Sequence, residues 1–353
     1  MPNPFLDQYI THNIYTQRLG SHNANEFDAF IKRADRIIRD ILSTAGDTIE
    51  SRKTLNRIIK RLGDELSPVY ADYSKLLISN LTELTETETP WNVNALGRGV
   101  DPVVSTPTSA TVLGAAFSRP VAFGNTSVII TELMKSFTLV ETRKVQNAVR
   151  QGWFEGQTVS EMVRTIRGTR LNKFKDGILA TTTRSAQTIA RTATNHIANQ
   201  TRQAVLDRND RLLDGVEWIS TLDRRTSSIC RIRDGIVYPV NKGPRPPAHP
   251  SCRSTIAPKV KKQFTLFSGQ ETRASVGATG GKPTQATNYY TWLRTQPASF
   301  QNEVLGPTKG KIFRNAGLDT AEFRKLVSNN FDQPLTIAQI RAKEPAIWKR
   351  LKL

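Results

Sequence analysis

Both cysteines of this 353-residue chain lie in one short segment, between Trp218 and Pro258. The segment also contains His249, one of only four histidines in the chain. Its prolines and its Asp-Gly pair exclude a continuous helix, because proline lacks a backbone donor and Asp-Gly favours a tight turn. Residues this rare would scatter along the chain if they only filled space. We therefore expect the segment to fold around a local cluster of side chains that carries the functional signal of the chain.

The side chains of Cys230, His249 and Cys252 are of the types that zinc prefers. Their spacing, C-x18-H-x2-C, supplies three ligands where a structural zinc site takes four. A disulfide between the two cysteines is an alternative. A second alternative is a compact loop in which both thiols are buried and the histidine hydrogen-bonds to the backbone. We favour this last arrangement, so no cofactor is expected, with zinc as an alternative. The candidates for a fourth ligand are Asp223, Asp234 and the distant His196.

No enzyme motif is found in the sequence. It has no G-x4-G-K-[ST] phosphate loop, no H-E-x2-H metal motif and no G-x-S-x-G nucleophile elbow. His249 could belong to a metal-dependent nuclease, but such sites need further histidine, asparagine or carboxylate groups on a shared metal. The sequence places none of these groups beside it. We therefore predict a protein that is not an enzyme and has no catalytic residue.

The chain is strongly basic, with 50 lysine and arginine residues against 31 acidic ones and a net charge of +19. Such an excess favours a polyanionic neighbour such as nucleic acid. Between Leu222 and Lys262, ten basic residues accompany two acidic ones. We interpret this local excess of basic residues as a surface that contacts DNA phosphates without reading the bases. The alternative is that these side chains only face solvent. The candidate DNA-contact residues are Arg224, Arg231, Arg233, Lys242, Arg245, Lys259, Lys261 and Lys262.

Most of the remaining sequence follows a helical period. Apolar residues recur three and four positions apart in residues 27–42 and again in 55–66, and a new helix is expected to begin at Pro68. A capping box at Thr158–Glu161 begins another helix, and a long helix is expected over about 182–207. The alternation then changes to period two, which predicts short strands around 216–257. The fold class is therefore mostly α, with a small α+β C-terminal part of the core domain, a helical N-terminal region and a helical tail.

The composition along the chain predicts five parts. A helical N-terminal region (1–99) is followed by a linker or extended arm (100–125) that is rich in proline and small residues, whose apolar side chains we expect to lie on another part of the protein. A core domain (126–262) comes next. A glycine-rich flexible linker (263–288) precedes a C-terminal helical segment (289–353). No run of about 18 apolar residues occurs, so no membrane-spanning helix is expected.

Two neighbouring motifs in the core domain resemble a known family. The pattern D-x-R-T-x3-C-x3-D-G, followed by P-P-x-H-P-x-C-R, is similar to the head morphogenesis proteins of tailed bacteriophages, the group typified by the F protein of phage Mu. The resemblance covers about residues 126–258, with Ala193 standing where the family usually has glutamate. The matching residues are Asp223, Arg225, Thr226, Cys230, Asp234, Gly235, Pro246, Pro247, His249, Pro250, Cys252 and Arg253.

The resemblance implies a minor head protein, or minor capsid protein. Such a protein is made in the cytoplasm of the infected bacterium and is carried in the virion, in the capsid interior or at the portal vertex. Its implied partners are the portal protein and the major capsid protein, and packaged double-stranded DNA suits the basic charge. Its implied role is to assist head assembly, with genome packaging or delivery as further roles. A protein ejected with the genome and a metal-dependent nuclease remain as alternatives.

Overall fold

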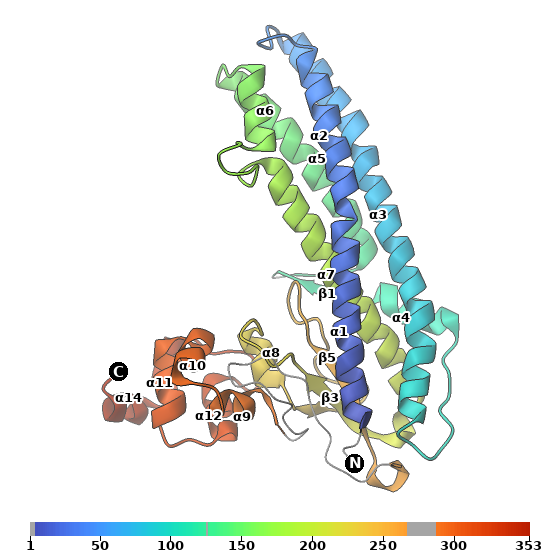
Figure 1. Cartoon of the computed structure of the whole chain (residues 1–353), viewed down its shortest axis with the longest axis vertical. Coiled ribbons are helices and arrows are strands. Elements are labelled where there is room, and N and C mark those ends of the chain that lie inside the picture. The colour runs from blue at the N-terminus through green and yellow to red at the C-terminus, as the bar shows by residue number, and fades with distance from the viewer. Residues whose placement is uncertain (1–3, 125, 267–286) are drawn as a thin grey trace.

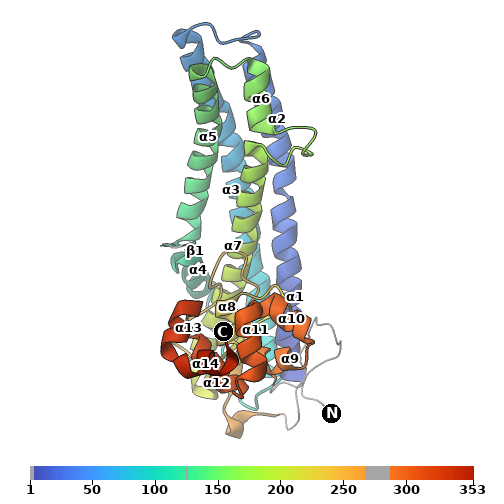
Figure 2. The same ribbon diagram turned by 90° about the vertical axis from the view of Figure 1, so that its left-hand side faces the viewer.

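The helical periods of the sequence fold into long helices that run side by side (Figure 1). α1 (Pro4–Asn25) leads into α2 (Phe27–Ser43), and α3 (Arg52–Gly97) returns along both of them. α5 (Ile130–Phe154) and α7 (Ile178–Arg208) pack against α3, and α7 also packs against α1. A second view at right angles shows the same elongated bundle (Figure 2). The predicted helical N-terminal region and the predicted long helix at 182–207 are both confirmed.

These coordinates come from a computed structural model of the chain. The described residues are 4–124, 126–266 and 287–353. Within those ranges no helix is both long enough and apolar enough to cross a membrane. The predicted flexible linker at 263–288 falls almost entirely outside the described residues.

α3 continues through Pro68, so the prediction that a new helix begins there is wrong. A proline in a helix interior removes one backbone hydrogen bond and crowds the preceding turn. On either side of it, however, Leu66, Val69 and Tyr70 are completely buried and keep the same helical phase. The packing of this stripe against α2, α5 and α7 outweighs the lost hydrogen bond, because burying each large apolar side chain stabilises by about 1.5–3 kcal/mol.

Residues 100–125 are not simply an extended arm. They contain α4 (Ser109–Ser118) and β1 (Val121–Phe123), which pairs with β2 (Thr126–Val128) in a small hairpin. Val112 and Ala116 of α4 are buried where this helix packs on α7 and α3. The expectation that this segment lies on another part of the protein is therefore confirmed, but its local structure was not anticipated.

α6 (Val159–Arg167) begins at the predicted capping box. The Thr158 hydroxyl accepts a hydrogen bond from the amide of Glu161 at 3.2 Å, and the Glu161 carboxylate accepts one from the amide of Thr158 at 2.7 Å. The helix ends at Gly168, whose φ of 92° is a conformation that residues with a Cβ rarely adopt. α6 then lies against α2 and α7 at the outer end of the bundle.

A three-stranded antiparallel sheet follows α7 and the short turn η1 (Asp210–Leu212). β3 (Leu213–Ile219) lies between β4 (Val237–Tyr238) and β5 (Thr255–Val260). Side chains from α1, α3 and the end of α7 share one core cluster with these strands. Most of β3 is buried on both faces, which explains why its sequence alternates imperfectly. The predicted strands around 216–257 are confirmed.

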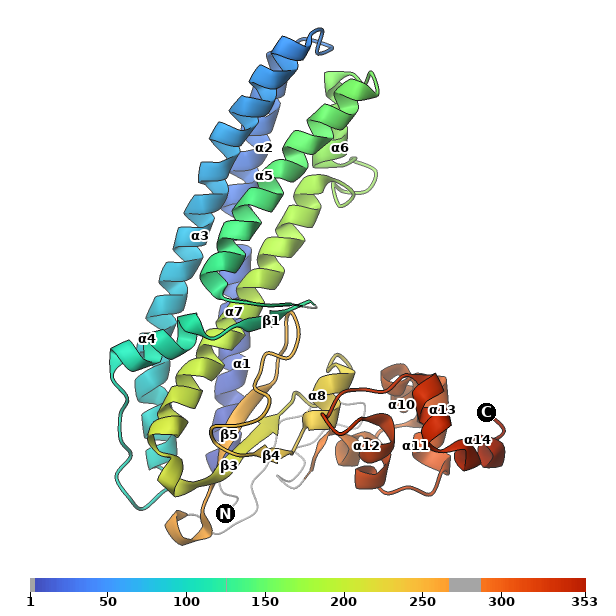
Figure 3. The same ribbon diagram turned by 180° about the vertical axis from the view of Figure 1, so that it is seen from behind.

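Short helices complete the chain beside the sheet (Figure 3). α8 (Ser228–Arg233) follows β3, and η2 (Lys262–Phe264) follows β5. The C-terminal helices have their own aromatic core, which Leu222 and Ile232 join from the sheet region. These helices are α9 (Tyr289–Arg294), α10 (Ala298–Leu305), α11 (Pro307–Asn315), α12 (Thr320–Val327), α13 (Ile337–Lys343) and α14 (Pro345–Leu351). Together with the bundle they confirm a mostly α fold with a small α+β part.

Candidate functional site

The two cysteines and His249 are brought together by one short helix and one loop. Cys230 lies on α8, whose first turn is capped by the hydroxyl of Ser227 at 3.4 Å from the Cys230 amide. His249 and Cys252 lie on the proline-rich loop that joins β4 to β5, and a tight turn joins them, because the Cys252 amide donates to the His249 carbonyl at 3.1 Å. The expectation of a local cluster is confirmed.

The three ligand atoms of this cluster lie within 4.8 Å of one another. The sulfur atoms of Cys230 and Cys252 are 3.6 Å apart, and the sulfur of Cys230 is 3.4 Å from Nε2 of His249. Both cysteines are buried and neither forms a disulfide.

The second ring nitrogen of His249 is held by the backbone. Nδ1 lies 2.9 Å from the carbonyl oxygen of Pro250, so this nitrogen carries the proton and donates. Nε2 then presents its lone pair to the sulfur of Cys230 and to the hydroxyl of Ser227, which is 2.8 Å away. The predicted hydrogen bond from this histidine to the backbone is present, and it leaves the other nitrogen directed into the cluster.

The two thiols differ in acidity because they share a hydrogen bond. The thiol of Cys230 donates to Cys252, and this bond, together with His249, lowers the pKa of Cys252 despite its burial. The same bond and the burial raise the pKa of Cys230. The hydrogen bond to Cys252 raises the pKa of His249 in turn. The shared hydrogen bond therefore makes Cys252 the more acidic of the two thiols.

The two aspartates proposed as a fourth ligand are engaged elsewhere. Asp223 accepts two hydrogen bonds from the Arg253 guanidinium, at 2.5 and 2.7 Å. Burial raises the pKa of Asp223, but this pair outweighs it, so the pKa of Asp223 is lowered overall. Asp234 accepts from the amides of Ser220 and Tyr289 at 2.6 and 2.7 Å. Both aspartates therefore organise the chain around the cluster.

His196, the third candidate, is also outside the cluster. It lies on α7, where its Nε2 is 3.1 Å from the carbonyl oxygen of Arg119. Burial lowers the pKa of His196 to about 4, so it is neutral in the folded protein at neutral pH. Within the described part of the chain, the group that could hold a metal contains Cys230, His249 and Cys252 and no fourth residue of these types.

Several of the basic side chains predicted to contact DNA hydrogen-bond within the chain. Arg231 donates to the carbonyl of Val304 at 2.5 Å, and Arg245 donates to Gln203 and to four backbone carbonyls. Arg233 is buried, with its guanidinium 5.1 Å from the centre of the Trp218 ring. Two more candidates have partners in the chain: Arg224 pairs with Glu303 and Lys261 donates to Arg211. The exposed lysines of the predicted set are Lys242, Lys259 and Lys262.

A second basic surface was not anticipated from the sequence. A groove of about 950 Å³ lies in the half of the bundle that is farther from the sheet (Figure 1). It is lined by α2, by the start of α7 and by the loop before α7. One acidic residue, Asp35, lines it, and this carboxylate pairs with Arg39 and Arg167. The cations of α2 lie at least 128 positions before the others in sequence, and the two groups meet only through helix packing. The basic residues that line the groove are Lys32, Arg36, Arg39, Arg167, Lys175 and Arg184.

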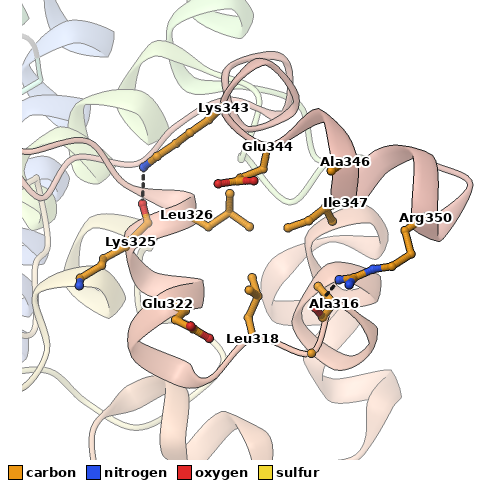
Figure 4. A pocket seen from close by; sticks show the side chains of 11 residues that line it. Ala316, Leu318, Glu322, Lys325, Leu326, Lys343, Glu344, Ala346, Ile347 and Arg350 are labelled. Carbon is orange, nitrogen blue, oxygen red and sulfur yellow. Dashed lines mark hydrogen bonds between the residues drawn. The ribbon is translucent and has the colours of Figure 1, made fainter.

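A second hollow lies among the C-terminal helices (Figure 4). It measures about 610 Å³, and two basic side chains at its edge satisfy free carbonyls at helix ends. Lys343 donates to the carbonyls of Lys325 and Ser328 at the end of α12, and Arg350 donates to the carbonyl of Ala316 after α11. Cations in such positions stabilise helix C-termini. This hollow is therefore explained by helix packing.

Comparison with known families identifies the class of protein. Residues 143–257 match the family described as Phage Mu protein F like protein. The match begins within α5, includes α6, α7 and the sheet, and ends in β5, so it contains the entire cysteine and histidine cluster. No curated protein and no solved structure matched the chain. Residues 143–257 are therefore similar to the Mu F-like domain, which supports a structural protein of the bacteriophage head.

Proposed function

We propose that this chain is a minor head protein of a tailed bacteriophage, located in the capsid interior or at the portal vertex. The observation that carries the proposal is the Mu F-like domain at 143–257, which supports a role in head morphogenesis. That domain does not stand alone. α7 packs along α1 and α3, so the N-terminal helices form one body with it. This elongated body suits a protein that spans between the portal or capsid wall and the packaged genome.

Contact with DNA is the second part of the proposal, and charge supports it. The positive charges that give a net charge of +19 repel one another, and this repulsion is offset when the protein lies beside DNA phosphates. The groove at the outer half of the bundle gathers six cations against one carboxylate. We propose that the phosphate backbone of packaged DNA lies against this groove, with Lys259 and Lys262 near the sheet as a second, smaller contact.

The test of the head-protein assignment uses phage particles. We expect the chain to be present in purified full heads, and we expect its deletion to lower the yield of infectious particles. A protein that leaves with the genome would be present in full particles and missing from emptied ones, whereas a resident head protein would be present in both. Absence of the chain from procapsids and from mature heads would overturn the proposal.

A further inference from the structure

We propose that Cys230, His249 and Cys252 bind one zinc ion, and that this ion holds together the turn-rich segment of the Mu F-like domain. The inference rests on side-chain geometry and does not depend on the proposed function. Soft thiolates combined with an imidazole favour zinc over the oxygen-seeking cations magnesium and calcium. Zinc also suits a buried site because two thiolates balance its charge, and the histidine remains neutral.

Two of the three separations in the cluster match edges of a zinc tetrahedron. With Zn–S of about 2.3 Å and Zn–N of about 2.0–2.1 Å, tetrahedral angles place two sulfur ligands about 3.8 Å apart and a sulfur and a nitrogen about 3.5 Å apart. The observed separations are 3.6 Å between the sulfur atoms and 3.4 Å between Cys230 Sγ and His249 Nε2. A disulfide would instead require the sulfur atoms to approach to about 2.05 Å. Two of the three separations therefore suit a metal, and all three ligand atoms lie within 4.8 Å of one another.

The histidine is prepared as a ligand by its backbone contact. Ligating histidines usually donate their other ring N–H to a carbonyl or carboxylate, which selects the tautomer and orients the ring. Nδ1 of His249 does this toward the carbonyl of Pro250, at 2.9 Å. The lone pair of Nε2 is thus directed at the cluster. A histidine that only filled space would need no such constraint.

The loop that carries two of the ligands is anchored on both sides. The Ser251 amide donates to Thr192 of α7 at 2.8 Å, and Asn13 of α1 donates to the Arg253 carbonyl at 2.9 Å. The Asp223–Arg253 pair ties the same loop to the chain before α8. These contacts hold the ligands in place before any metal binds, which lowers the entropy cost of binding.

Water supplies the fourth ligand in this proposal. A hollow of about 180 Å³, lined by Cys252 and by residues of α1 and α7, adjoins the cluster and is large enough for water. Ser227 Oγ is hydrogen-bonded to Nε2 of His249 at 2.8 Å. When the metal takes that lone pair, the hydroxyl is released to hold the metal-bound water. The site is thus a three-residue zinc site with a water, and the burial of both sulfurs directs it toward structure rather than catalysis.

The metal content of the purified full-length chain tests this directly. The protein is prepared without metal-affinity steps and measured by elemental analysis, and a second sample is loaded with cobalt to record the absorption of tetrahedral cobalt–thiolate bonds. We expect about one zinc ion per chain. We also expect thiolate-to-cobalt bands in the loaded sample. Cys252→Ser and His249→Gln should each lower zinc occupancy at least tenfold at a fixed concentration of a competing chelator.

Two control variants keep the result interpretable. His22→Gln removes an exposed histidine of α1 and should retain full zinc occupancy. Ser227→Ala keeps all three ligands and should retain zinc with only a modest loss of affinity. The wild-type chain decides the question even if a ligand variant fails to fold. A folded wild-type protein that contains no zinc after refolding with excess zinc, or zinc that persists in Cys252→Ser, would overturn the proposal.

Discussion

Arg202 offers the sharpest test of how the bundle is joined to the sheet. This side chain of α7 is only 1% exposed. Its guanidinium donates to the Asn92 side chain of α3 at 2.8 Å and to the Ile256 carbonyl of β5 at 3.0 Å. It lies 3.9 Å from the buried Glu88 carboxylate, and its charge lies over the Tyr9 ring of α1. Arg202 thus connects its own helix, α7, with the helices α1 and α3 and with the strand β5.

Replacing this cation by an apolar chain of similar length should be costly. Arg202→Met leaves the Glu88 carboxylate buried with His12 and Asn92 as its remaining partners. Removing one partner of a buried ion pair typically costs about 3–5 kcal/mol when the other charge is left without compensation. His12 and Asn92 remain beside Glu88, so we expect a loss at or below the lower end of that range. Glu88→Gln removes that charge. The double variant should therefore be more stable than the sum of the single effects predicts, by about 1–3 kcal/mol.

Urea unfolding of the wild type, both single variants and the double variant measures this coupling energy. The matched control is Arg33→Met, because Arg33 forms an exposed pair with Asp72 at 3.1 Å and should contribute only about 0–1 kcal/mol. A loss below about 1 kcal/mol for Arg202→Met, or additive effects in the double variant, would show that this buried cation does not join the bundle to the sheet.

Three further predictions follow from other parts of the structure. Burial lowers the pKa of His196 from its usual value of 6.5 to about 4, so between these pH values the unfolded chain binds more protons than the folded chain. The free energy of unfolding should therefore fall as the pH drops from about 6.5 to 4. His196→Gln should flatten this part of a plot of urea midpoint against pH, and an unchanged slope would refute the lowered pKa of His196. Thr158→Ala should lower the free energy of unfolding by about 1 kcal/mol through loss of the capping box, and no change in a thermal melt would contradict this. DNA binding should be independent of sequence and should weaken steeply as the salt concentration rises. The double variant Arg36→Glu/Lys175→Glu should reduce the slope of log affinity against log salt more than Lys259→Glu does. An equal slope for the wild type, the double variant and Lys259→Glu would place the DNA contact outside the groove.

The elements that were predictable from sequence are those with strong local signals. The apolar stripes of α2 and α3 and the capping box at Thr158 depend on residues three and four positions apart, so their outcome is decided locally. The prediction at Pro68 was wrong because the sequence shows the lost backbone hydrogen bond but not the packing against other helices that outweighs it. The second half of α7 shows the same limit. It buries Asn195, Asn199 and Arg202, whose partners lie in distant segments.

The candidate site was predictable in composition but not in detail. The rarity of cysteine and histidine identified the three clustered residues, and the Mu F-like motif added the surrounding aspartates. The sequence could not show that Asp223, rather than Asp234, pairs with Arg253, or that backbone amides bind Asp234, because these partners depend on the folded loop. Nor could it show that the basic groove forms, because its cations come from helices that are far apart in the chain.

Asymmetric cryo-electron microscopy of full heads tests the head-protein assignment most directly. α3 has 46 residues, so a bundle of helices about 70 Å long should be visible. We expect this bundle inside the head beside the portal, with its basic groove facing layers of packaged DNA. Density for the bundle only on the outer capsid surface, or no such density in heads that contain the protein by mass spectrometry, would contradict that placement.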